Sequence, residues 1–368
     1  MDTHRAEWRS GLDEVDAALL DEHQGGFPVR EAPFDVLAEE LGTDPGDVLD
    51  RLRTHADAGI VRRVGPVLDP SVIGSSVLAG LSVPEEQFYE VAKIVNEYPQ
   101  VSHNYRRDQE WNMWFVLAAQ SRERRDELLE EIADRSDLEP LVLPKRREYC
   151  LDLQFPIVSD SRSRKPAAVS DSSGPTSDAE ERIDTNPDRR RSEPETSREL
   201  SMLDRTVLEA IQEGFPLTET PYRDLADDLE VDVASLLSSI EGLLADGYIK
   251  RLGVIVSHRS AGFRSNCMVV WNVPDEELDR IGEYAGSRPY VTKCYYRPRR
   301  PERGWEYNLF TMIHGRDPDR VDEWIEELAE SIDAPYQRLN TTEKLKQTGT
   351  RYGALLADRP EADRADES

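Results

Sequence analysis

The chain has 368 residues, a length that predicts two or three domains with a sizeable buried core. Its 74 Asp and Glu against 46 Lys and Arg give a net charge of -28, which repels nucleic-acid phosphates and is typical of proteins that work in very high salt. The cysteines suit neither a disulfide framework nor a zinc clip, and no membrane helix or signal peptide is predicted, so we expect a cytoplasmic protein of a halophilic host.

Three short helices and a strand are predicted near the start of the chain. Apolar residues recur at helical spacing in Val15–Leu20, Phe34–Leu41 and Val48–Leu52, and an apolar-basic strand follows at Ile60–Val64. Thr43-Asp44-Pro45 has the pattern of a helix cap with a proline in the first turn. This order is typical of a winged helix-turn-helix domain.

The next segment alternates strands and helices. Strands are predicted at 77–83, 100–107, 111–118 and 138–143, and helices at 85–97 and 122–133. The order βαββαβ is typical of a ferredoxin-like domain, in which two helices cover one face of an antiparallel sheet. The other face of that sheet needs a cover.

The same pattern recurs later in the chain at a shift of 188 residues, so that Gly26-Phe27-Pro28 reappears as Gly214-Phe215-Pro216. Its last strand is predicted at Tyr336–Leu345. We therefore predict an α+β protein of two tandem copies, each a winged helix-turn-helix domain followed by a ferredoxin-like domain. The predicted segments are helix-turn-helix domain 1 (1–70), ferredoxin-like domain 1 (71–156), a disordered linker rich in Ser, Pro, Asp and Arg (157–198), helix-turn-helix domain 2 (199–260), ferredoxin-like domain 2 (261–357) and an acidic tail (358–368).

The third helix of each helix-turn-helix domain is the element that would enter the major groove of DNA. In copy 1 this helix carries two arginines among several aspartates, and in copy 2 it has no Lys or Arg before Lys250. A groove-reading helix needs polar or basic side chains for base edges and cations for phosphates. We therefore expect these domains to serve as scaffold or dimerisation elements, and DNA is not an expected partner.

One predicted strand in each copy carries a row of polar and aromatic residues on one face. The rows, each with the valine predicted to share its face, are Val101, His103, Tyr105 and Arg107 in copy 1 and Val291, Lys293, Tyr295 and Arg297 in copy 2. Such a row fits a dry core poorly, and it suits a flat apolar molecule with carboxylates on its rim. The alternative is that the aromatic rings fill a core or an interface and that the histidine is structural.

Several longer motifs occur in both copies. They are Gly26–Phe34 with Gly214–Tyr222, Arg62–Gly65 with Arg251–Gly253, and His103–Arg107 followed by Asn112–Phe115, with Asn308–Gly315 in copy 2. Through these motifs each copy resembles an Lrp/AsnC-type protein, and more narrowly the siroheme decarboxylases of the alternative haem pathway. Enzymes of that family are usually two similar subunits that pair, so the chain resembles both subunits fused through the linker.

The resemblance implies a carboxy-lyase that converts siroheme to 12,18-didecarboxysiroheme by releasing two acetate carboxyl groups as carbon dioxide. It implies intrachain pairing of the copies, no added cofactor and no protein metal site, because the iron enters inside the siroheme. The reaction needs a proton donor for carbon and cations that hold the other carboxylates. The residues implied are His103, Lys293 and His314 as catalytic groups, and Tyr105, Arg106, Arg107, Asn112, Trp114, Tyr295, Arg297 and Asn308 as substrate-binding groups.

The two copies have diverged at these positions. Lys293 stands where copy 1 has His103, and His314 stands where copy 1 has Ala118. Either one composite site draws groups from both copies, or one copy catalyses and the other supports it; the sequence leaves this open. A transcription regulator and a tetrapyrrole carrier without catalysis are the alternative functions.

Overall fold

The structure is a computed structural model that describes residues 11–151, 200–257, 262–263, 265–348 and 353. The predicted linker and acidic tail lie outside these residues. Copy 1 contains α1 (Glu14–Asp21), α2 (Pro33–Leu41), α3 (Pro45–Asp57), β1 (Val61–Leu68), α4 (Pro70–Ile73), β2 (Ser75–Leu81), α5 (Phe88–Glu97), β3 (Val101–Arg107), β4 (Met113–Ala119), α6 (Arg122–Ser136), β5 (Leu141–Pro144) and β6 (Arg147–Leu151). Copy 2 contains α7 (Met202–Ile211), α8 (Pro221–Asp228), α9 (Val233–Ala245), β7 (Ile249–Val256), β8 (Ser265–Trp271), α10 (Leu278–Gly286), β9 (Val291–Tyr296), β10 (Leu309–Gly315), α11 (Pro318–Ile332), β11 (Tyr336–Leu339) and β12 (Thr341–Gln347).

Both helix-turn-helix domains form as the apolar spacing predicts. The Asp44 side chain caps α3 by accepting a hydrogen bond of 2.8 Å from the Gly46 amide, and Pro45 occupies the first turn. Gly59 follows α3 with φ +70°, a left-handed conformation that favours glycine. None of the helices in the described residues is both long and apolar enough to cross a membrane.

The two helix-turn-helix domains join through β1 and β7, which pair as an antiparallel ribbon with Gly65 opposite Gly253. The repeated Gly-Phe-Pro motif places one phenylalanine of each copy beside the ribbon. The Phe27 amide donates to the Leu252 carbonyl (2.9 Å), and the rings of Phe27 and Phe215 stack with centroids 6.3 Å apart. Apolar side chains of both domains thereby form one core, which gives these domains the pairing role that their sequence predicts.

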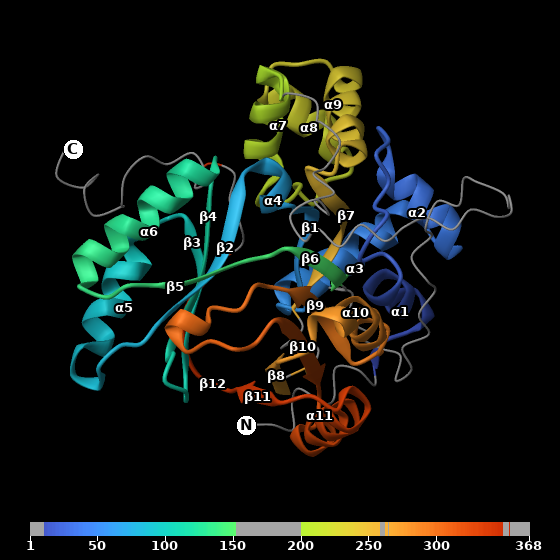
Figure 1. Cartoon of the computed structure of the whole chain (residues 1–368). Coiled ribbons are helices and arrows are strands. Elements are labelled where there is room, and N and C mark those ends of the chain that lie inside the picture. The colour runs from blue at the N-terminus through green and yellow to red at the C-terminus, as the bar shows by residue number, and fades with distance from the viewer. Residues whose placement is uncertain (1–10, 152–199, 258–261, 264, 349–352, 354–368) are drawn as a thin grey trace, which may run out of the picture.

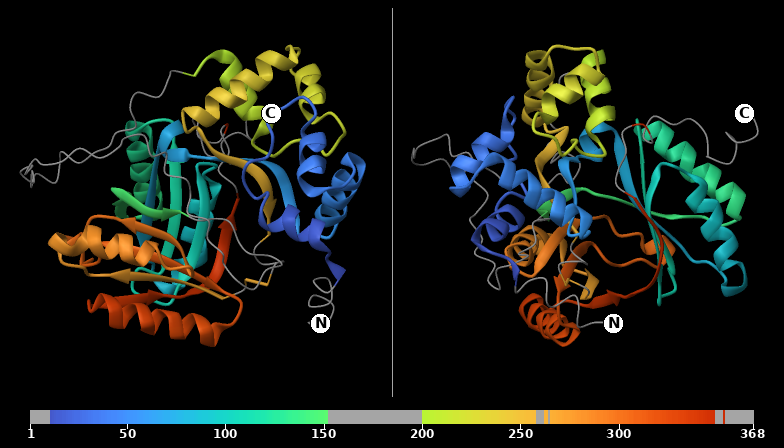
Figure 2. Two further views of the ribbon diagram at one scale, coloured as in Figure 1. Left: turned by 90° about the vertical axis from the view of Figure 1, so that its right-hand side faces the viewer. Right: turned by 180° about the vertical axis from the view of Figure 1, so that it is seen from behind.

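Strand exchange builds the two larger sheets. One sheet has the order β12-β3-β4-β2-β5 and the other β11-β8-β10-β9-β6, so each sheet receives an edge strand from the opposite copy. In Figure 2, seen from behind, red β12 runs beside the teal strands of copy 1. The single last strand predicted at Tyr336–Leu345 is therefore wrong: the chain leaves one sheet after β11 and joins the other as β12. The strand β6 was not predicted.

The two sheets face each other, and their helices lie outside. Helices α5 and α6 cover the outer face of one sheet, and α10 and α11 cover that of the other (Figure 1). The space between the sheets is filled by a shared apolar cluster that includes Trp114 and Leu143 from copy 1 and Phe310 and Leu339 from copy 2. The cover that each ferredoxin-like sheet needed is thus the sheet of the other copy.

A bulge at the start of β3 and of β9 decides which residues share a face. The pairing of β3 with β4 shifts register between Val101 and His103, and the pairing of β9 with β10 shifts between Met312 and Ile313. Each shift reverses the alternation of side chains along the strand. Val101 and Val291 therefore lie in the cores under the helices, and the prediction that they share a face with the polar rows is wrong.

Candidate active site

The remaining residues of each row stay together on the inner face of their sheet. Tyr105 pairs with Trp114 and Tyr295 with Phe310, and both of these partners belong to the cluster between the sheets. We call the group of His103, Tyr105 and Arg107 with Lys344 of β12 half-site 1. The equivalent group of Lys293, Tyr295 and Arg297 with Glu148 of β6 is half-site 2.

His103 is half-buried and held by its neighbour in the bulge. Its Nδ1 lies 2.9 Å from the Ser102 hydroxyl oxygen. Burial lowers the pKa of His103 to about 4, and the positive charges of Lys293, Lys344 and Arg62 lower it further in the same direction. Because Lys293 belongs to copy 2, the surroundings of His103 contain charged groups from both copies.

Lys293 and Tyr295 are the corresponding groups of half-site 2. Burial, and then the charge of Arg297, lowers the pKa of Lys293, so its ammonium form is disfavoured. Burial also raises the pKa of Tyr295, which keeps its hydroxyl protonated. His314 lies on the neighbouring strand β10, and its Nδ1 is 2.8 Å from the Thr292 hydroxyl oxygen. The structure therefore ties His314 to Thr292, the residue before Lys293, at a position where copy 1 has an alanine.

Arg107 and Arg297 connect the two sheets. Arg107 donates to the Leu339 carbonyl of copy 2, and Arg297 donates to the Leu143 carbonyl of copy 1. Burial lowers the pKa of each guanidinium to about 10. Both arginines therefore hold the two sheets together through hydrogen bonds. Substrate binding by them stays a prediction.

Four other predicted binding residues lie away from this group or serve the fold. Arg106 points to the helix side of its sheet, where it forms an ion pair with Glu85 (2.5 Å). The side chains of Asn112 and Asn308 bond the backbone of Val83 and Val273, respectively. Trp114 is fully buried between the sheets, and its indole donates to the Trp111 carbonyl.

A cleft of about 480 Å³ opens at the other end of β3. Its lining residues are Glu85, Arg106, Arg107, Asp108, Gln109, Asn112, Thr342 and Glu343. Three acidic residues in this lining oppose the two arginines, and His103 is not part of it. The charge of this cleft suits a polyanion poorly, so we place the candidate active site at the half-sites.

Comparison with known proteins identifies the family. The model for the AsnC-like ligand binding domain matches residues 73–150 and 260–346, and the model for the siroheme decarboxylase NirDL-like HTH domain matches 16–62 and 204–250. The siroheme decarboxylase NirDL subunit of Paracoccus denitrificans is 32% identical over 349 residues, which cover 94% of this chain and 99% of that protein. The chain belongs to the siroheme decarboxylase NirDL family.

A shorter relative and a solved structure show that this member of the NirDL family contains two copies in one chain. The siroheme decarboxylase NirD subunit of Pseudomonas aeruginosa is 43% identical over 146 residues, which are 97% of that subunit and only 40% of this chain. The crystal structure of NirDL with an iron-uroporphyrin III analogue has a TM-score of 0.67 at 24% identity and covers 93% of this chain and 95% of that one. The fold predicted from the repeats is therefore confirmed over both copies.

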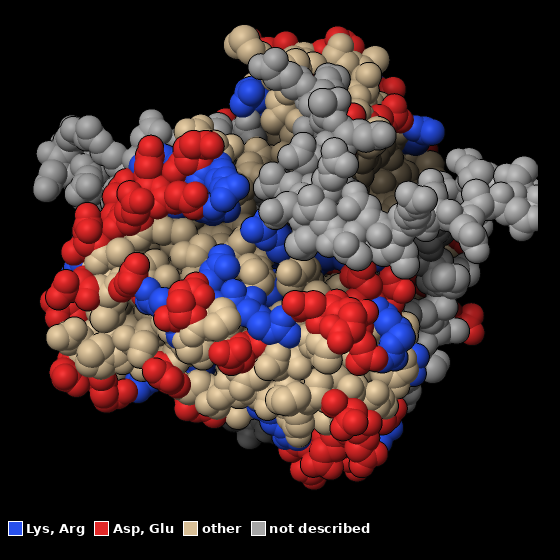
Figure 3. Space-filling model, in the orientation of Figure 1, with Lys and Arg blue, Asp and Glu red and all other residues tan. Residues whose placement is uncertain are grey.

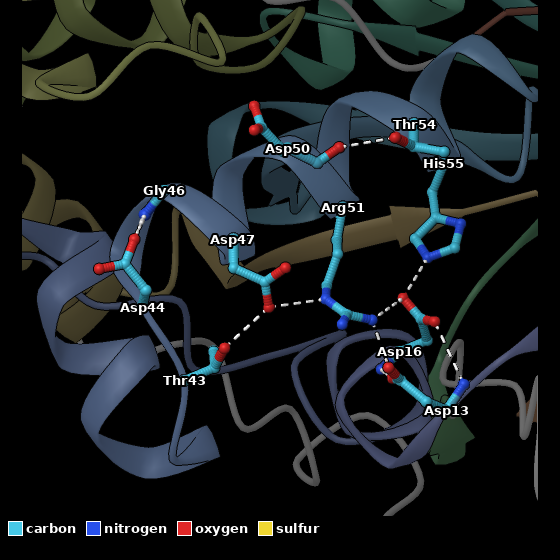
Figure 4. Close-up of polar contacts among 10 residues, drawn as sticks. All are labelled: Asp13, Asp16, Thr43, Asp44, Gly46, Asp47, Asp50, Arg51, Thr54 and His55. Carbon is cyan, nitrogen blue, oxygen red and sulfur yellow. Dashed lines mark hydrogen bonds and ion pairs between the residues drawn. The ribbon is translucent and has the colours of Figure 1, made fainter.

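In this NirDL-family chain, the third helix of copy 1 is committed to internal contacts (Figure 4). Arg51 forms ion pairs with Asp13 (2.8 Å), Asp16 (3.0 Å) and Asp47 (2.8 Å), and His55 lies 2.9 Å from Asp16. The other arginine of this helix donates to the carbonyl of residue 217 in copy 2. Arg51 thus holds its own domain together and Arg53 ties that domain to copy 2, which leaves both arginines poorly placed for DNA phosphates.

Sequence reasoning missed three charged residues of the site in this NirDL-family protein. Lys344 and Glu148 enter the half-sites only because β12 and β6 are exchanged between copies, and nothing in the local pattern signals that exchange. Arg62 was noted only as part of a repeated motif, and its charge acts on His103 from the wing strand β1. Figure 3 shows that Lys and Arg also gather over the middle of one face, with Asp and Glu around them, although the chain as a whole is strongly acidic.

Proposed function

We propose that this protein is a siroheme decarboxylase that releases the C12 and C18 acetate carboxyl groups of siroheme as carbon dioxide and yields 12,18-didecarboxysiroheme. In each step the carbon–carboxylate bond breaks, its electron pair stays on the methylene carbon, and one proton added there produces a methyl group. No electron is gained or lost overall. The proposal therefore calls for no added cofactor, and the iron is part of the substrate.

The observation that carries the proposal is a histidine and an array of cations from both copies, on aromatic strands of a NirDL-family sandwich. A flat macrocycle with carboxylates on its rim matches this combination of rings and positive charges. The same fold in the NirDL crystal structure contains an iron-uroporphyrin III analogue, which supports a tetrapyrrole as the ligand of this fold.

His103 is the proposed proton donor. Its pKa of about 4 keeps the imidazole neutral near pH 7 while the site is empty. Substrate carboxylates that pair with Lys293, Lys344 or Arg62 would cancel the positive charges that disfavour the imidazolium. Binding of the polyanion would therefore reverse the part of the lowered pKa that these charges cause, while burial, the larger cause, stays, and a substrate carboxylate beside the imidazole would favour the protonated form that donates to carbon.

Lys293 and the tyrosines have supporting roles in this proposal. The buried amine of Lys293 can pair with a carboxylate that is being dehydrated, while Tyr105 and Tyr295 lie against the macrocycle. His314, which contacts the neighbour of Lys293, is the corresponding proton donor if half-site 2 also reacts. The cytoplasm of a halophilic host is the proposed setting, supported by the charge of -28 and by three free cysteines, Cys150, Cys267 and Cys294.

The test is decarboxylation of siroheme by the purified protein without oxygen, followed by mass spectrometry and release of carbon dioxide. We expect the successive loss of two carboxyl groups. His103→Gln should lower kcat by about 100-fold or more and keep binding, because a positioned proton donor contributes about 10²- to 10⁴-fold. Arg280→Gln is the matched control, since Arg280 lies on the outer helix α10 in an ion pair with Glu277 (2.8 Å). Intact siroheme bound without loss of carboxyl groups would refute the function and favour a carrier.

A further inference from the structure

Two of the three cysteines stand opposite each other where the copies exchange a strand. Strand β6 of copy 1 lies beside β9 of copy 2 (Figure 1), and in this pairing Cys150 is the partner of Cys294. Directly opposite residues of an antiparallel pair have Cα atoms about 4.5 to 5.5 Å apart and point to the same face of the sheet. A disulfide joins residues whose Cα atoms are about 4.4 to 6.8 Å apart, so the two strands already have the spacing that this bond needs.

Both side chains point toward helix α10 on the outer face of the sheet. The Cys294 thiol donates to the Gly282 carbonyl oxygen of this helix, with 3.4 Å between sulfur and oxygen. A methyl group at Gly286 would lie 3.1 Å from Cys150 Cβ, so the glycine lets α10 pack closely over this residue. The Cys150 sulfur lies 3.7 Å from the Val291 carbonyl oxygen. A thiol is a weak donor, so these contacts oppose a turn of the sulfurs toward each other only weakly.

The two thiols differ in their access to solvent, and this difference sets the order of a reaction. Cys150 is partly exposed, whereas Cys294 is fully buried. Burial raises the pKa of the Cys294 thiol, and the neighbouring Cys150 raises it further, as expected for two groups that are close together. Thiols react with oxidants as thiolates, so a reagent that arrives from solvent meets its reactive partner at Cys150.

We propose that Cys150 and Cys294 are a reversible modification site, at which a low-molecular-weight disulfide oxidises the two thiols to a disulfide that joins the copies. The Cys150 thiolate attacks one sulfur of the small disulfide, forms a mixed disulfide and releases one small thiolate. Cys294 then attacks the Cys150 sulfur and releases the second small thiolate. The two protein thiols lose two electrons and two protons, and the small disulfide gains them and becomes two thiols. The second step is intramolecular and is favoured because Cys294 already stands opposite its target.

The bond would act on the exchanged strand. Strand β6 is an edge strand that places Glu148 opposite Tyr295 in half-site 2, and the Tyr149 hydroxyl ties it to Asp279 of α10 at 2.7 Å. A disulfide at Cys150, two residues after Glu148, adds a covalent tie between the copies at the same place. Disulfides of cytoplasmic proteins are usually transient and redox-sensing. Oxidation would therefore change how firmly half-site 2 is held, whichever molecule it binds.

The test treats the purified full chain with glutathione disulfide and maps its peptides by mass spectrometry without reduction. We expect a mass lower by two hydrogen atoms, a peptide pair joined through Cys150 and Cys294, and reversal by dithiothreitol. Cys294→Ser should stop at a lasting glutathione adduct on Cys150, because the second thiol is missing. Cys267→Ser is the matched control: Cys267 is buried and stands opposite Ile313 on β10, so this variant should form the bond as the wild type does.

Three results with the wild-type chain would overturn the inference, and none of them depends on whether a variant folds. They are a lasting glutathione adduct on Cys150, two cysteines that both stay reduced, and a disulfide that includes Cys267. Urea unfolding of the oxidised and the reduced protein measures the effect of the bond. The oxidised wild type should have the higher midpoint, since the bond restrains the unfolded chain, and equal midpoints would show that the bond does not hold β6.

Discussion

The low pKa of His103 makes the stability of the protein depend on pH in a way that one substitution should remove. The folded pKa of about 4 lies below the value of about 6.5 for a histidine in an unfolded chain. Between these two values the unfolded chain binds more protons than the folded one. The contribution of His103 to the free energy of unfolding therefore has its full value above about pH 6.5, and it is lost as the pH is lowered toward 4.

The size of this effect follows from the two pKa values. Lowering the pH from 7.5 to 5 should decrease the free energy of unfolding by about 2 kcal/mol through His103 alone. The reason is that pH 5 lies about one and a half units below the unfolded pKa of about 6.5, and each unit corresponds to about 1.4 kcal/mol. His103→Gln cannot titrate and keeps a polar group near the Ser102 hydroxyl. The variant should lose about 2 kcal/mol less than the wild type over the same pH step.

Urea unfolding at pH 7.5 and pH 5, in one high-salt buffer, measures both differences. Other histidines, such as the buried His55 and His314, are present in both proteins, so their contributions cancel in the comparison. The charged groups that act on His103 are Lys293, Lys344 and Arg62, and all three are present in both proteins. If the wild type and His103→Gln lose the same stability between the two pH values, the buried neutral imidazole does not exist.

Three further predictions concern the architecture. Gly253→Ala should lower the unfolding free energy by more than about 3 kcal/mol, because the new methyl group would lie 2.2 Å from the Gln24 carbonyl oxygen. The control Gly11→Ala, whose methyl group would have nothing within 4 Å, should lower it by less than about 0.5 kcal/mol. Equal losses would contradict the close approach of the two copies. Arg297→Met should lower the unfolding free energy by about 1.5 to 3 kcal/mol through loss of its bond to the Leu143 carbonyl, and an unchanged urea midpoint would show that this strut is dispensable. Duplex DNA should bind only weakly and without sequence preference in a fluorescence anisotropy titration, and a specific complex at high salt would contradict the internal use of the α3 arginines.

Much of the fold follows from local patterns in the sequence. Apolar spacing located the helices of both helix-turn-helix domains, and the cap at Asp44 marked the start of α3 because capping is a contact between near neighbours. The repeat of the Gly-Phe-Pro motif revealed two copies. The fold class left one face of each sheet in need of a cover, and the resemblance to a family of paired subunits implied that the copies pair. These inferences succeed because each depends on residues within a few turns of one another, or on a repeat that is visible along the chain.

The site was predicted less completely, for two physical reasons. One extra residue in the bulges before His103 and Lys293 reverses the alternation of faces, and no residue type there announces a bulge. The exchange of β6 and β12 depends on which edge strand pairs best in three dimensions, so Glu148 and Lys344 could not be assigned to the half-sites from spacing. Arg106, by contrast, was predicted to bind substrate only because it lies between Tyr105 and Arg107 in the sequence. Side chains alternate along a strand, so Arg106 points to the helix side of the sheet.

The exchanged edge strands also shape how the two halves of this chain can change over evolution. The cation beside Tyr105 is encoded at the end of copy 2, and the carboxylate beside Tyr295 is encoded at the end of copy 1. A substitution in the closing strand of either repeat therefore alters the chemistry of the opposite repeat and leaves its own untouched. Because both copies lie in one chain, β12 is always inherited together with half-site 1, and β6 together with half-site 2. The two half-sites can therefore evolve opposite charges while each keeps the edge strand that fits it.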